Sequence, residues 1–201
     1  MVKILCVSDT VMPQLESAVN LRRRYNDVQL VVSCGDLPAV YLEYIVSTLN
    51  VPLFYVRGNH DERYSESPPG GENLHMRVIT HRGLTFAGLE GCMRYNDGEI
   101  QYSDSQMMWM AMRLSLSPSL RNGLDVLVTH SPPRGIHDRP DRAHTGFKAL
   151  RRFMHWRSPR YLLHGHTHTW DRRDIVQTQY RNTCVININP VTLLDVEPLG
   201  R

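Results

Sequence analysis

The sequence predicts an α/β fold, and three observations support this prediction. Apolar runs of strand length alternate with helical patterns over residues 2–56. Each of these runs ends beside an Asp or Asn, at the position where open α/β sheets place their ligands. No repeat, low-complexity tract or linker divides the chain, so we expect one domain over residues 1–201.

The first part of the chain follows the order strand, helix, strand, helix, strand. The three apolar runs are residues 2–7, 28–33 and 51–56. Helical spacing of apolar residues is found over about 14–24 and again over 41–48. Because helices connect these strands, we expect a parallel sheet with right-handed crossovers.

The second part of the chain adds further strands and two helices. Ser103 is expected to cap one helix, and Phe147 lies near the start of another. Residues 173–197 contain short strands with no helix between them, so we expect antiparallel additions to a second sheet. The remaining predicted strands are 76–80, 84–89, 124–128 and 160–163.

The composition is that of a globular protein and limits its partners. Hydrophobic residues make up 41% of the chain, charged residues 21%, and the formal charge is only +3. Without a long basic stripe, nucleic acid is not an expected partner. No apolar run has membrane-spanning length and the start does not resemble a signal peptide, so we expect a cytoplasmic protein with no membrane contact. Cys6 and Cys34 are then buried, reduced thiols.

Nearly all basic residues are arginines, since Lys3 and Lys148 are the only lysines. Arginine binds phosphate groups in a bidentate manner, which suits a small phosphorylated substrate. The commoner explanation is a solvated surface, and the count alone does not choose between the two.

Five strand ends carry side chains that bind divalent metal ions. A strand-end His or Asp taken alone is usually structural, but five in succession favour a metal centre. Oxygen and imidazole donors without thiolates suit Mn, Fe, Zn or a similar ion. Asp36 could bridge two such ions about 4 Å apart, the spacing of two-metal phosphoryl chemistry. The candidates are Asp9, Asp36, Asn59, His130 and the pair His166 and His168.

These residues lie in motifs that resemble the calcineurin-like metallophosphoesterase superfamily. Four of its five motifs are intact and occur in the family order. The resemblance implies an α/β fold in four layers, an αββα sandwich of two mixed β-sheets flanked by helices. The motifs here are Asp9-Thr10-Val11, Gly35-Asp36, Gly58-Asn59-His60-Asp61, His130 and Gly165-His166-Thr167-His168.

The resemblance also implies a role for each residue. Asp36 would bridge two divalent ions; Asn59, His130 and His166 would complete one site, and Asp9 and His168 the other. The implied reaction is phosphoester hydrolysis, in which a metal-activated hydroxide attacks phosphorus. His60 would stay off the metals and assist the leaving group. Asp61 would either orient His60 or cap the following turn. We expect a phosphodiester rather than a monoester.

Val11 departs from the family pattern, which has His at this position as a metal ligand. The site of Asp9 and His168 is therefore expected to be weak. Three possibilities follow: two ions with water in the vacant position, one ion alone, or a substitute ligand such as Gln14 or Glu16.

The motifs are also compatible with functions other than phosphodiester hydrolysis. Loss of a ligand could convert the enzyme into a protein-binding scaffold, and a phosphomonoesterase or a nuclease is also compatible with the motifs. The oligomeric state is not predicted. Specificity would come from loops 62–73, 90–102 and 134–145. Residues in these loops that could contact a substrate are Arg63, Tyr64, Arg94, Tyr95, His137 and His144.

Overall fold

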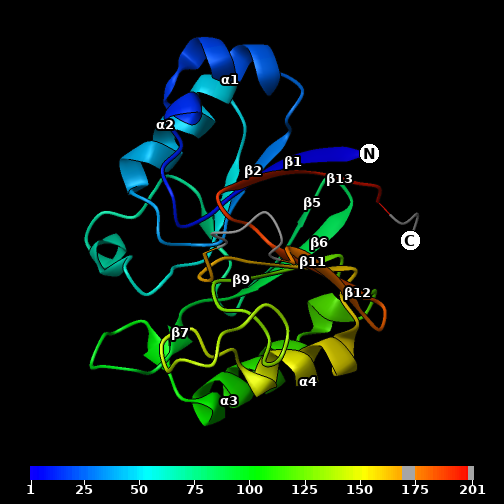
Figure 1. Ribbon diagram of the computed structural model, residues 1–201. Coiled ribbons are helices and arrows are strands. Elements are labelled where there is room, and N and C mark those ends of the chain that lie inside the picture. Colours follow the sequence, from blue (N-terminus) through cyan, green and yellow to red (C-terminus); the bar gives the residue numbers. More distant parts are fainter. Residues whose placement is uncertain (169–174, 199–201) are drawn as a thin grey trace.

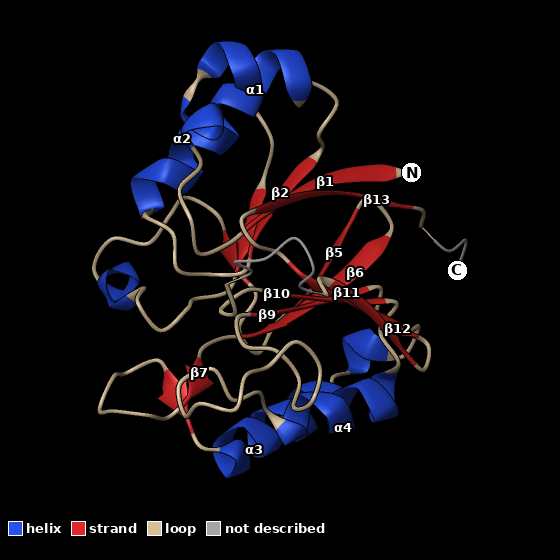
Figure 2. Cartoon of the chain, viewed as in Figure 1, coloured by secondary structure: helices blue, strands red, loops and turns tan. Residues whose placement is uncertain are grey.

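Two mixed β-sheets lie face to face between two pairs of helices (Figures 1 and 2). The computed structural model describes residues 1–168 and 175–198. The α-helices are α1 (Ala18–Arg24), α2 (Ala39–Leu49), α3 (Asp104–Ser115) and α4 (Lys148–Arg157). Short 3-10 helices are η1 (Pro13–Glu16), η2 (Glu62–Ser65) and η3 (Pro118–Leu120).

The first sheet contains β1 (Val2–Val7), β2 (Leu30–Ser33), β3 (Leu53–Tyr55), β4 (Glu72–Asn73) and β13 (Val191–Val196). Their order is β13-β1-β2-β3-β4. The second sheet contains β5 (Val78–His81), β6 (Leu84–Leu89), β9 (Val126–Thr129), β10 (Tyr161–His164), β11 (Gln177–Tyr180) and β12 (Thr183–Asn187). Their order is β11-β12-β10-β9-β6-β5, and β7 (Cys92–Met93) pairs separately with β8 (Gln101–Tyr102).

Alternate residues of each central strand face opposite layers, as strand geometry requires. In β1, Ile4 and Cys6 belong to the apolar cluster between the two sheets. Leu5 and Val7 face the other way and pack with residues of α1 and α2. The strand is apolar at nearly every position because both of its faces are buried. A third apolar cluster joins the second sheet to α3 and α4, which completes the αββα architecture predicted from the sequence.

The strand register brings the carboxyl ends of the central strands into one row. β1, β2 and β3 are parallel, with Val7 opposite Ser33 and Ser33 opposite Tyr55. In the second sheet, β6, β9 and β10 are also parallel. The loops that follow these strands therefore gather at the same edge of the sandwich.

Two sequence-based expectations are wrong in detail. The helix expected over 14–24 is interrupted at Ser17, whose hydroxyl accepts the Asn20 amide and starts α1 after the short η1. The last strands are not all antiparallel additions to the second sheet. β12 is parallel to β10, and β13 returns to the first sheet as an antiparallel neighbour of β1.

Two further features of the fold concern the length of its helices and the burial of its cysteines. Among the described residues, no helix combines the length and the apolar character needed to cross a membrane. Cys6 and Cys34 are free thiols with no exposed surface. Burial raises the pKa of the Cys6 thiol to about 12, so it stays protonated at neutral pH.

Candidate metal centre

The residues that follow five parallel strands converge between the two sheets. Three of them adopt left-handed backbone conformations, with φ of 60° at Asp9, 58° at Asp36 and 67° at His166. Such values are uncommon for residues with a side chain and concentrate at functional sites. Here they turn the chain sharply just beyond β1, β2 and β10.

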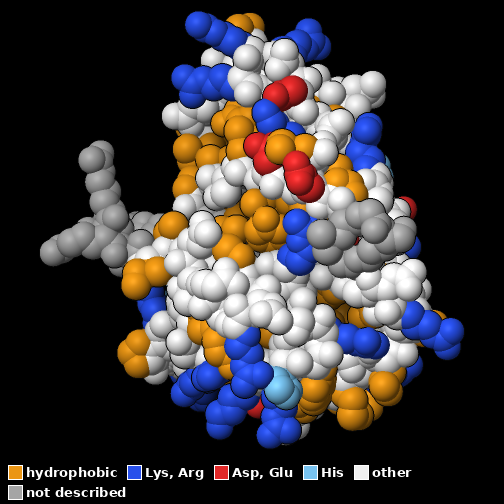
Figure 3. Space-filling model, turned by 90° about the vertical axis from the view of Figure 1, so that its right-hand side faces the viewer, with side chains coloured by type: hydrophobic (Ala, Val, Ile, Leu, Met, Phe, Trp, Pro, Cys, Tyr) orange, Lys and Arg blue, Asp and Glu red, His pale blue; other side chains and the backbone are white. Residues whose placement is uncertain are grey.

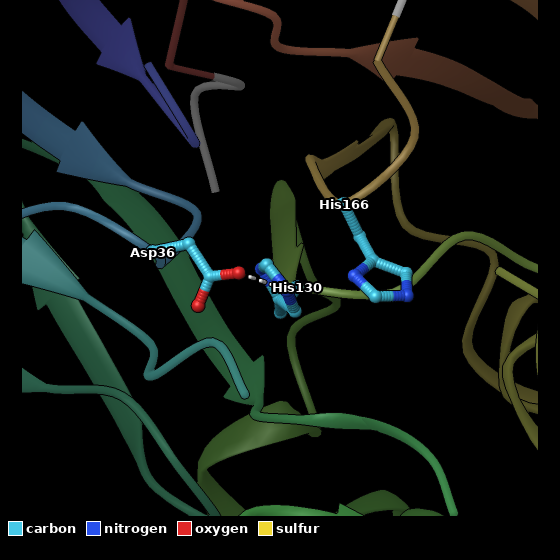
Figure 4. A group of neighbouring side chains, drawn as sticks. All are labelled: Asp36, His130 and His166. Atoms are coloured by element: carbon cyan, nitrogen blue, oxygen red, sulfur yellow. Dashed lines mark ion pairs between the residues drawn. The ribbon is translucent and has the colours of Figure 1, made fainter. Parts of the chain in front are cut away.

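Asp36, His130 and His166 form a compact donor group (Figure 4). One ligand atom from each residue lies within 4.8 Å of the other two. His130 Nε2 is 3.3 Å from Asp36 Oδ2 and 3.1 Å from Asn59 Oδ1. An ion with bonds of about 2.1 Å needs donor atoms within about 4.2 Å of one another, so small side-chain rotations suffice. Carboxylate and imidazole donors suit divalent ions, and this group could hold one.

Neighbouring groups orient the rings of His130 and His166 and the side-chain amide of Asn59. His130 Nδ1 is 2.8 Å from the Cys34 carbonyl oxygen, which leaves Nε2 to face Asp36. His166 Nε2 is 2.8 Å from the Ala143 carbonyl oxygen, which leaves Nδ1 as the lone-pair nitrogen. Contacts of this kind fix the ring orientation of metal-binding histidines. Asn59 Nδ2 donates to the Tyr95 hydroxyl at 3.2 Å, so that its Oδ1 faces His130.

Asp61 joins the two loops that carry Asp36 and Asn59. Its Oδ2 accepts the backbone amides of Gly58 and Asp36, each at 2.8 Å. The His60 amide donates in turn to Asp36 Oδ1 at 2.8 Å. Asp61 does not cap the following turn as one of the two roles considered for it required, since its side chain makes no cap bond to η2. It instead holds the loop of Asp36 against the loop of Asn59.

Two motif glycines are required because side chains of the centre press against their backbone. A Cβ added at Gly58 would lie 2.0 Å from Asp36 Oδ1 and 2.7 Å from His130 Cε1. A Cβ added at Gly165 would lie 2.0 Å from Ser8 Oγ and 2.3 Å from Asp9 Oδ2. Both positions therefore exclude any larger residue without displacement of a candidate ligand.

The electrostatics separate the protonation states of the three donors. Burial opposes charge on both Asp36 and His130, but their mutual attraction outweighs it. The pKa of Asp36 is therefore held well below its usual range, and the pKa of His130 rises to about 9. Burial lowers the pKa of His166 to about 3, so its ring is neutral and has a lone pair to donate.

Asp9 and His168 lie beside this donor group rather than within it. Both line a cavity of about 300 Å³ that also contains Asp36, Asn59 and His60. The two carboxylate oxygens of Asp9 accept the His166 backbone amide at 3.1 and 2.9 Å. Burial raises the pKa of Asp9. The six predicted ligands thus lie in or beside one cavity. Asp36, His130 and His166 form the donor group, and Asn59 adjoins it through His130.

Val11 lies away from this cavity. Its side chain packs against the apolar cluster beneath α1 and α2. It lines a different cavity together with Glu16 and Tyr41. Glu16, one of the two substitute ligands considered, therefore lines this second cavity and not the cavity of the donor group.

Comparison with known proteins gives a match over most of the chain. The sequence model of the family described as calcineurin-like phosphoesterase matches residues 2–170. The chain belongs to this family. A comparison of this chain with curated protein sequences found no match.

Solved structures of other proteins share the fold of this family member. The protein TT1561 of Thermus thermophilus is 16% identical, with 92% of this chain and 88% of that chain covered and a TM-score of 0.61. GAP50, described as the anchor in the inner membrane complex of Plasmodium, is 10% identical, with 92% and 70% covered and a TM-score of 0.53. A lower structural similarity is found with a Vps29 single mutant from Entamoeba histolytica, which is 16% identical, with 98% of this chain and 87% of that chain covered and a TM-score of 0.49.

The structure also assigns places to residues that the sequence named only as loop candidates. Tyr95 and His144 line the cavity of this phosphoesterase-family chain, and the His144 ring lies 5.0 Å from that of His166. His137 lies elsewhere, with Nδ1 2.9 Å from Nε2 of the buried His164. Spacing gave no signal for Tyr95 or His144, because both come from irregular loops that only the folded chain brings to the centre.

Proposed function

We propose that the chain is a metal-dependent phosphoester hydrolase that acts on a small diester. The observation that carries this proposal is the convergence of Asp36, Asn59, His130 and His166 beside a cavity lined by His60. A divalent ion held by these four residues would supply Lewis-acid chemistry, polarising water and offsetting negative charge on the phosphoryl group.

His60 is the residue proposed to move a proton. Its side chain is exposed at the cavity, and its backbone amide is tied to Asp36 Oδ1. The ring therefore has access to a substrate while its main chain stays fixed relative to the donor group. We assign it the donation of a proton, or a strong hydrogen bond, to the departing ester oxygen.

Two ions are proposed, with unequal affinity. The second ion could be held by three residues that line the same cavity, Asp9, Asp36 and His168. Val11 adds no ligand to this site, because its side chain packs in the apolar cluster beneath α1 and α2. Metal counting on purified protein tests this proposal, with Val11→His as the comparison. We expect one firmly held ion and one weak ion in the wild type. Two equally firm ions in the wild type would refute the weakened second site.

The hydrolase proposal is tested by elemental analysis combined with a substrate panel. The protein is loaded with Mn²⁺ and assayed on phosphomonoesters, phosphodiesters and cyclic nucleotides. We expect turnover with preference for diesters, and loss of both metal and turnover in Asp36→Asn. Asp27→Asn serves as the matched control, because Asp27 is an exposed carboxylate that pairs with Lys3 and does not line the cavity of the donor group.

A protein-binding scaffold is the second candidate, favoured by the apolar environment of Val11. GAP50, which shares the fold, is described as an anchor. Full metal occupancy without turnover on any of these substrates would support the scaffold. A nuclease is less favoured, since on the face shown in Figure 3 the Lys and Arg side chains form separate groups rather than a continuous stripe.

A further inference from the structure

A larger cleft opens next to the cavity of the donor group. Its volume is about 590 Å³, within the range of small-molecule sites. Asp36 and His60 line both spaces, so the cleft begins where the metal cavity ends. One wall comes from the segment that leads into α2, and the other comes from η2. In Figure 1, η2 is the short teal helix below α2.

The wall formed by the start of α2 is apolar. It consists of Leu37, Pro38, Ala39 and Val40, and the Val40 side chain is 73% exposed. Pro38 is exposed as well, Ala39 is half-buried, and Leu37 lies buried beneath them. An exposed apolar wall beside a polar cavity is typical of a site that binds a ligand with both characters.

The opposite wall provides one cation. Arg63 of η2 is exposed and lines the cleft. Within residues 1–168 and 175–198, no carboxylate pairs with its guanidinium. The acidic neighbour Asp61 is buried and accepts two backbone amides, so it does not neutralise Arg63. The guanidinium is therefore available to an anionic group in the cleft.

We propose that this cleft binds the leaving group of the substrate, and that this group has an apolar or aromatic body with an anionic substituent. The inference rests on the proposed function. A phosphoryl group at the donor cavity places its departing oxygen near His60, and the organic group beyond that oxygen extends into the cleft. The apolar wall then contacts its body, and Arg63 contacts its anionic substituent.

Binding of three phosphonates to the Mn²⁺-loaded protein tests the proposal by isothermal titration calorimetry. Methylphosphonate reports on the donor cavity alone, benzylphosphonate adds an aromatic body, and (4-carboxybenzyl)phosphonate adds an anion. We expect at least tenfold tighter binding at the first step, from burial of the ring against the apolar wall. A further gain of about fivefold is expected at the second step.

Two variants and one matched control separate the contributions. Val40→Asn is expected to reduce the benzyl advantage about fivefold, and Arg63→Gln to remove only the advantage of the carboxylate. Val19→Asn is the control, because Val19 is the second residue of α1, as Val40 is of α2, and is 75% exposed. It should bind all three ligands as the wild type does. Ser67→Trp, which fills the cleft from its rim, should abolish the benzyl advantage.

The outcomes distinguish the cleft from the function. Equal binding of the three phosphonates by a protein that hydrolyses diesters would overturn the cleft and leave the hydrolase intact. A benzyl advantage that survives Val40→Asn and Ser67→Trp would place the ring elsewhere and also overturn it. Failure of all three to bind a metal-loaded protein that also shows no turnover on the substrate panel would overturn both proposals, and the same failure in a protein that hydrolyses diesters would overturn the cleft alone.

Discussion

Gly58→Ala should damage the metal centre through a single methyl group. The backbone at Gly58 is one that alanine can adopt, so the effect comes from contact alone. The new Cβ would lie 2.0 Å from Asp36 Oδ1, whereas ordinary contact begins at 3.4 Å. The carboxylate must therefore retreat by about 1.4 Å, the difference between these two distances. That movement breaks the 2.8 Å bond from the His60 amide and separates Asp36 from His130.

We expect Mn²⁺ affinity to fall about 10- to 100-fold, the usual effect of disturbing groups that orient metal ligands. The free energy of unfolding should fall by about 1–3 kcal/mol from overpacking. Both are measured on the same preparations, by calorimetric metal titration and by urea unfolding of the metal-free protein. Gly70→Ala is the control, since a Cβ there meets nothing within 4 Å. Wild-type Mn²⁺ affinity in Gly58→Ala would refute the proposed position of Asp36.

Four further predictions concern protons and the supporting contacts of the centre. Because the pKa of His130 is raised to about 9, Mn²⁺ must displace a proton from its ring at neutral pH. Mn²⁺ affinity should therefore rise nearly tenfold per pH unit from pH 7 to about 9. Calorimetric titrations in buffers of different ionisation enthalpy should count about one proton released per bound ion. In the metal-free protein the same shift stabilises the fold below pH 6.5, and this contribution should be lost as the pH rises to about 9, as followed by urea unfolding. His60→Ala should slow hydrolysis of esters with poor leaving groups about 100-fold or more, and of p-nitrophenyl esters far less, and equal losses would remove the acid role. Tyr95→Phe removes the bond that holds the Asn59 amide, and should weaken Mn²⁺ binding about tenfold, whereas unchanged binding would show that Asn59 needs no such support.

The sequence was most informative where burial and chemistry coincide. The strand over residues 2–7 was predicted with its observed bounds, because a strand buried on both faces is apolar throughout. Ser103 was correctly expected to cap α3, where it forms a capping box with Gln106. The donors after each strand could be named because metal-binding side chains at the ends of apolar runs are unusual.

Other features depend on contacts that no local pattern encodes. The pattern of residues 191–196 predicts a short strand but does not say which sheet it joins. A strand added to the second sheet and a strand paired with β1 would have the same pattern. The supporting bonds of Asp61 and Tyr95 join segments that are 25 and 36 residues apart in sequence. The separation of Val11 from the metal cavity likewise follows from its packing beneath α1 and α2 rather than from its neighbours in the chain.

The most direct test is an anomalous difference map from crystals of the protein grown with MnCl₂. We predict a strong peak with Asp36 Oδ2, Asn59 Oδ1, His130 Nε2 and a ring nitrogen of His166 at about 2.2 Å from it. At saturating Mn²⁺, a map with no peak among these four residues would contradict the metal centre and the chemistry proposed from it.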